Sequence, residues 1–158
     1  MGILVVRDGV TVPVLYARIG DPTWSMSLTR ANDGAILSAG MGMSVIRVSK
    51  GGSIEATYPP LDPGPSSTGW NQTADAYDVV PGRNGTTVLG GRISSDELWM
   101  GIGRRLKDGS PDPDFGTGGA RAYGVVGGGG TILILRDGRY VLAGSESSGY
   151  GLMLRVWD

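Results

Sequence analysis

Short alternating or apolar runs, separated by turn residues, make up most of the hydrophobic pattern of this chain. A run, a Gly-containing turn and a second run recur at residues 27–40, 78–91 and 131–144. Each turn holds an Asp-Gly or Asn-Gly pair, which supplies the positive φ that tight hairpins need. No window of a dozen residues keeps an apolar 3.6-residue period without an interrupting Gly or Pro. The pattern predicts an all-β, antiparallel fold of about a dozen strands.

The three hairpins are spaced regularly. Their turn glycines, Gly34, Gly85 and Gly138, are 51 and 53 residues apart, and the strand-ending Gly40, Gly91 and Gly144 keep the same spacings. A further apolar strand follows each hairpin, at residues 43–48, 98–106 and 150–157, and carries Arg47, Arg104 or Arg155. Four strands in a period of about 50 residues are typical of a β-propeller blade.

This period predicts one β-propeller-like repeat domain over residues 1–158, with about three blades near residues 24–58, 76–125 and 131–158. Residues 1–18 match the third strand, second turn and fourth strand of a blade, whereas the last repeat stops after its third strand, so we expect residues 1–18 to complete a blade. Propellers have about four to eight blades, and exposed strand edges recruit other strands. We therefore expect a partial or oligomer-completed β-propeller. Its partner is a second copy of the chain or another protein of an assembly.

Two stretches carry a family resemblance. Residues 98–119, LWMGIGRRLKDGSPDPDFGTGG, join an apolar strand with Arg, an Asp-Gly-Ser turn and an Asp-x-x-Phe-Gly-x-Gly-Gly element. Residues 131–155, TILILRDGRYVLAGSESSGYGLMLR, supply the other half of the motif. Over residues 76–158 the chain resembles the delta-60 repeat, whereas a Pro- and Ser-rich loop replaces the Phe-Gly element near residues 59–73. The resemblance implies a propeller-type fold, as in bacterial surface and secreted proteins and phage tail components, and it implies no catalytic residues.

Composition narrows the chemistry. The chain has no Cys and no His, so disulfides, thiolate metal sites and dedicated transition-metal sites are not expected, and neither is a cofactor. Its net charge is -1 without a large Lys/Arg cluster, which argues against nucleic acid as a partner. The first residues form a short apolar run without a basic leader, so we expect neither a signal peptide nor membrane insertion. The compartment stays open, with a virion-associated location as one option.

Charged residues concentrate around residues 104–114. Arg104, Arg105 and Lys107 are expected at an ordinary solvated strand end. The Gly-rich stretch that follows holds Asp108, Asp112 and Asp114. This carboxylate set is a weak calcium candidate, because turn aspartates commonly cap backbone amides instead.

The irregular loop at residues 58–75 is the candidate binding segment. It carries Tyr58, Trp70, Asn71 and Gln72, and a Trp beside amide side chains suits stacking on a sugar or anchoring a protein interface. The other tryptophans, Trp24, Trp99 and Trp157, are expected in the core.

These features favour a non-catalytic structural or binding module, a component of a larger assembly such as a phage tail or a cell-surface structure. The alternative is a carbohydrate-binding propeller that uses the 58–75 loop. A carboxylate-based hydrolase is a distant third, since no carboxylate pair stands out by its spacing and no Ser has a His base.

Overall fold

The protein consists of antiparallel β-sheets. The computed structural model describes residues 2–7, 10–16, 25–65, 72–94, 97–146 and 148–157. These residues contain strands, turns and one short 3-10 turn, η1 (Arg83–Gly85), and no α-helix. The prediction of an all-β, antiparallel fold is thus confirmed. No helix in the described ranges is long and apolar enough to span a membrane.

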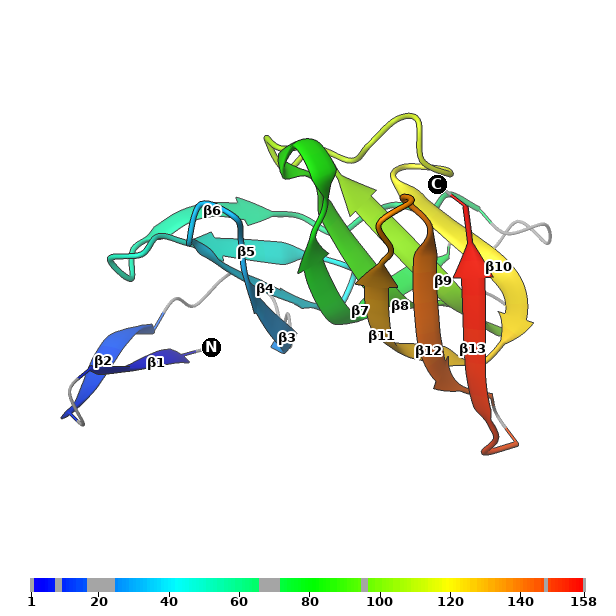
Figure 1. Cartoon of the computed structure of the whole chain (residues 1–158), viewed down its shortest axis with the longest axis horizontal. Coiled ribbons are helices and arrows are strands. Elements are labelled where there is room, and N and C mark those ends of the chain that lie inside the picture. The colour runs from blue at the N-terminus through cyan, green and yellow to red at the C-terminus, as the bar shows by residue number, and fades with distance from the viewer. Residues whose placement is uncertain are drawn as a thin grey trace.

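Three meandering sheets follow one another along the chain (Figure 1). The first sheet contains β3 (Ser25–Arg30), β4 (Ile36–Gly40), β5 (Val45–Val48) and β6 (Ile54–Tyr58). The middle sheet contains β7 (Thr73–Pro81), β8 (Thr87–Ser94), β9 (Leu98–Arg105) and β10 (Ala120–Val126). The last sheet contains β11 (Gly128–Ile134), β12 (Tyr140–Ser145) and β13 (Gly151–Val156).

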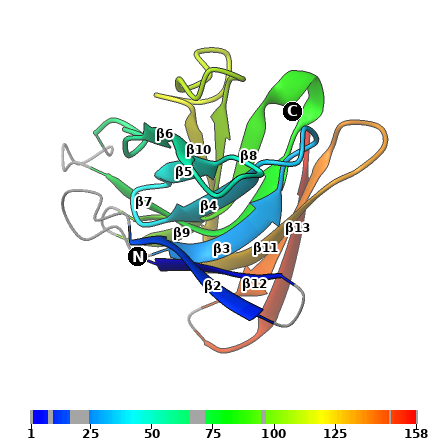
Figure 2. The same ribbon diagram turned by 90° about the vertical axis from the view of Figure 1, so that its left-hand side faces the viewer.

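A separate N-terminal hairpin is formed by β1 (Gly2–Arg7) and β2 (Val10–Tyr16). These two strands pair with each other and with no other strand in the part of the chain that the structure describes. Figure 2 views the stack from the side on which the hairpin and the first sheet lie.

The three sheets pack face to face around two apolar cores. The first core, between the first and middle sheets, includes Leu37, Val45, Val79 and Leu89. The second core, between the middle and last sheets, includes Val88, Ile102, Ile132, Tyr140 and Leu142. Because side chains alternate along a strand, neighbouring Val88 and Leu89 of β8 serve opposite cores. The middle sheet is therefore covered on both faces.

The sheets repeat in register down to single residues. The first strand of each sheet contains a register shift that skips one residue: Met26 in β3, Tyr77 in β7 and Gly130 in β11. These β-bulges are 51 and 53 residues apart, the same offsets as those of the turn glycines. Positions at these offsets are called equivalent below.

The first strands of the three sheets, β3, β7 and β11, lie side by side. Asp78, directly after the bulge of β7, joins them. Its carboxylate accepts hydrogen bonds from Ser27 Oγ (3.1 Å), Thr131 Oγ1 (2.7 Å) and the backbone N–H of Ile132 (2.9 Å). Ser27, Asp78 and Thr131 are themselves equivalent positions, so the same point of each repeat meets at this seam.

Candidate functional site

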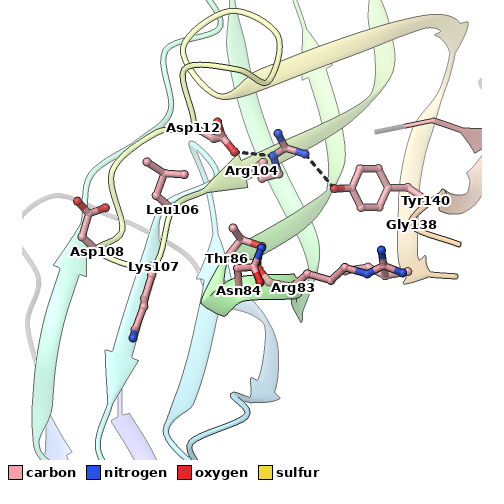
Figure 3. Close-up of a pocket in the computed structure, with 12 residues that line it drawn as sticks. Arg83, Asn84, Thr86, Arg104, Leu106, Lys107, Asp108, Asp112, Gly138 and Tyr140 are labelled. Carbon is pink, nitrogen blue, oxygen red and sulfur yellow. Dashed lines mark hydrogen bonds and ion pairs between the residues drawn. The ribbon is translucent and has the colours of Figure 1, made fainter. Parts of the chain in front are cut away.

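A cavity of about 830 Å³ lies where turns of the middle and last sheets meet (Figure 3). Three segments form its wall: the β7–β8 turn, the end of β9 with the loop that follows, and the β11–β12 hairpin. The polar residues of this wall include Arg83, Asn84, Arg104, Lys107, Asp112 and Tyr140. They come from sequence positions almost sixty residues apart.

The β7–β8 turn gives this wall its shape. Gly82 N–H donates to Thr86 O at 2.8 Å, and the Thr86 hydroxyl donates to Arg83 O at 2.8 Å. Asn84 and Gly85 both adopt positive φ, 53° and 80°, a conformation that Asn and Gly tolerate best. The Arg83 side chain extends from this turn toward Gly138 and donates to the Arg136 carbonyl of the neighbouring sheet.

Arg104 is the polar centre of the cavity. Its Nε donates to Asp112 Oδ2 at 2.6 Å and its Nη1 donates to the Tyr140 hydroxyl at 3.3 Å. The guanidinium carbon lies 4.7 Å from the centre of the Phe115 ring, so the charge is also placed over an aromatic face. Arg104 is therefore held by groups of both sheets.

Electrostatics fix the protonation of the groups that line the cavity. Burial raises the pKa of Tyr140, although Arg104 partly offsets this effect, so the hydroxyl stays protonated at neutral pH. Hydrogen bonds from the Ser110 hydroxyl and backbone lower the pKa of Asp108, which stays ionised. Fixed charges beside a neutral hydroxyl suit the recognition of a polar ligand.

Arg105 corrects the prediction of a solvated strand end at residues 104–107. Its side chain is 0% exposed, and it points away from Arg104 toward the first sheet. Its Nη1 donates to Gly109 O (2.9 Å), and its Nη2 donates to the carbonyls of Met43 (3.0 Å) and Pro59. Burial lowers its pKa to about 10, so it remains charged at neutral pH. The prediction was wrong because backbone carbonyls of three loops converge where solvent was expected.

The four predicted binding residues are placed differently. Trp70 and Asn71 lie outside the described residues. Gln72 is half-buried, and its backbone N–H donates to Gly64 O at 3.2 Å. Tyr58 packs against the first core, with the Arg105 guanidinium carbon 6.0 Å from its ring centre. The binding role of the 58–75 loop stays a prediction.

The three aspartates of the calcium candidate do not converge. Asp108 accepts hydrogen bonds from Ser110, and Asp112 accepts from Arg104 and from the backbone N–H of Asp114. Among the residues placed by the structure, no three His, Cys, Asp or Glu side chains come together at a metal-sized site.

The two faces of each sheet are also of functional interest. We call the face of a sheet that packs on the next sheet its forward face, and the opposite one its rear face. In the first and middle sheets the forward face carries Val45 and Ile102, which are almost fully buried. The equivalent residue of the last sheet is Met153. Val45, Ile102 and Met153 each pair with the same position of the second strand of their own sheet.

The forward face of the last sheet is open. Met153 is 77% exposed, and Leu133 of the same face is 59% exposed. Trp157, which follows β13, is 67% exposed beneath the Arg139 guanidinium, whose carbon is 4.8 Å from its ring. The prediction that Trp157 belongs to the core was therefore wrong, because it lies on a sheet face that no other sheet of the described chain covers. Trp99 is half-buried, and Trp24 lies outside the described residues.

The chain matches no protein-family profile, and no curated protein matches it.

Proposed function

We propose that the protein is a non-catalytic binding and assembly module whose sheets are successive blades of a propeller-type arrangement. The adjacency of β3, β7 and β11 supports this proposal, because blades of a propeller also place their first strands next to one another around the axis. The hydrogen bonds of Asp78 to both neighbouring strands follow the same arrangement.

One observation carries the proposal: the forward face of the last sheet exposes Met153 at the position where the other two sheets bury Val45 and Ile102. Contiguous exposed apolar patches mark interaction sites. A component of a larger assembly, such as a phage tail or a cell-surface structure, would cover this face in its working state.

The chemistry of the cavity also favours binding over catalysis. Asp112 is engaged with Arg104, and Asp108 has a lowered pKa, which makes it a weak base. The hydroxyl beside Asp108, that of Ser110, donates to this carboxylate, and the low pKa of Asp108 makes it a poor base for activating that hydroxyl.

Methionine oxidation in cell extract tests this proposal. We expect the chain, in an extract of cells that express it, to migrate above its 16.4 kDa mass, with Met153 oxidised by peroxide as slowly as the buried Met43. A chain that migrates as a monomer in the extract, with Met153 oxidised much faster than Met43, would contradict an assembly function.

A further inference from the structure

We propose that the forward face of the last sheet docks on the rear face of the first sheet of a second copy, so that two copies close a ring. The proposal rests on the assembly function above and names the partner that covers the open face.

The first sheet carries the matching half of this contact. On the rear faces, Val79 of the middle sheet and Ile132 of the last sheet are buried against the preceding sheet. Their equivalent in the first sheet, Leu28, is 59% exposed. The chain therefore makes a forward-to-rear contact twice within itself, and it leaves Met153 and Leu28 exposed at the positions that these contacts bury.

The seam of first strands places polar side chains at equivalent positions, Ser27, Asp78 and Thr131. The bonds differ between the two internal junctions, because Asp78 accepts the Ile132 N–H of the next sheet, whereas Ser27 donates to Asp78. In the docked pair, the Thr131 hydroxyl of one copy lies beside Ser27 of the other.

Closure follows from the direction of the contact. A forward face on a rear face is a heterologous contact, which forms a ring when the rotation closes. Two copies of three stacked sheets give six sheets, within the range of about four to eight blades that propellers use. The closed ring leaves neither the Met153 face nor the Leu28 face in solvent.

Two substitutions distinguish this forward-to-rear dimer from dimers that use other surfaces. Met153→Asp places a charge on the forward face and Leu28→Asp places one on the rear face, at exposed positions where folding does not need the side chain. Pro113→Asp, on an exposed loop away from both faces, is the control. By light scattering at micromolar concentration, we expect the parent and the control at twice 16.4 kDa and each face variant at 16.4 kDa. Circular dichroism should show the same strand content in all four proteins.

Mixing the two face variants is the decisive measurement. The forward face of Leu28→Asp and the rear face of Met153→Asp are both intact, so an equimolar mixture should form a mixed dimer, detected by native mass spectrometry. A parent that is monomeric at micromolar concentration overturns the proposal, even if an extract still shows a larger complex and the assembly function stands. So does a Leu28→Asp variant that remains dimeric, or a mixture that stays monomeric.

Discussion

Arg105 is the residue on which the junction of the first and middle sheets depends most. It is buried, no described carboxylate pairs with it, and its charge is solvated by the carbonyls of Gly109, Met43 and Pro59. A planar guanidinium reaches several carbonyls at once, which a single ammonium does not do. The arginine thus replaces the water that those three carbonyls would otherwise bind.

We expect Arg105→Lys to lower the free energy of unfolding by roughly 3 kcal/mol, because at least one buried carbonyl loses its donor and the ammonium stays buried. Urea denaturation followed by circular dichroism measures the change. Arg136→Lys, at an exposed position, is the matched control and should change stability by less than about 0.5 kcal/mol. Equal stability of the two variants would contradict the role assigned to Arg105.

Tyr140 predicts a dependence of stability on alkaline pH. Burial raises its pKa above the ordinary value of 10.0, so the unfolded chain loses this proton at a lower pH than the folded chain. The free energy of unfolding should therefore fall as pH rises above about 10. In Tyr140→Phe this fall should be shallower, while at neutral pH the variant loses only the hydrogen bond to Arg104, about 1 kcal/mol. Urea denaturation at several pH values measures both effects, and an unchanged slope would show that Tyr140 is not the group responsible.

At the scale of the elements, Asp78 ties the first strands together. Asp78→Ala leaves the partly buried Ile132 N–H without its acceptor, and we expect it to lower the free energy of unfolding by about 2 kcal/mol. Asp62→Ala is the control, since this carboxylate accepts the backbone N–H of Gly64 in an exposed turn. Thermal denaturation compares the two. If both variants melted at the same temperature, the seam would owe its stability to apolar packing instead.

The hairpins were the most predictable elements. Gly34, Gly85 and Gly138 all adopt positive φ in turns that join paired strands, as the Asp-Gly and Asn-Gly pairs predict. The bulges at Met26, Tyr77 and Gly130 were not predictable, because residues with nothing in common occupy them and their position is set by backbone hydrogen bonds. The cavity was not predictable from the sequence either, because the walls of the cavity come from turns that only the stacking of the sheets brings together.

Burial of the charged and aromatic residues was predicted least well. An arginine next to Arg104 is expected in solvent, and only the convergence of carbonyls from other loops explains its burial. A tryptophan in a strand is expected in a core, but Trp157 lies on a face for which the described chain has no cover. Both errors concern contacts between sheets, which a pattern read along one strand does not contain.

At the scale of the whole molecule, the N-terminal hairpin is separate from the three stacked sheets in its strand pairing. It pairs with no other described strand, whereas β13 is an edge strand of the last sheet. We expect removal of residues 1–18 to leave the melting temperature of the monomeric Met153→Asp chain within about 2 °C, because the three stacked sheets keep their pairing. The sequence predicts that residues 1–18 complete a blade, so we expect the hairpin to extend β13 of the second copy and the same deletion in the parent chain to weaken dimerisation. Sedimentation velocity across a dilution series measures this, and an unchanged dissociation constant would assign the hairpin no part in assembly.

The pairing of strands only with their neighbours in sequence also has a consequence for folding kinetics. Each sheet is a meander, so its hydrogen bonds close short loops and form before contacts between distant segments. The two cores, in contrast, form only when whole sheets meet. Opening the second core therefore detaches the last sheet as one cooperative unit while the first and middle sheets stay together. Native-state hydrogen exchange should accordingly show the amides of β11, β12 and β13 exchanging together, earlier than those of β8.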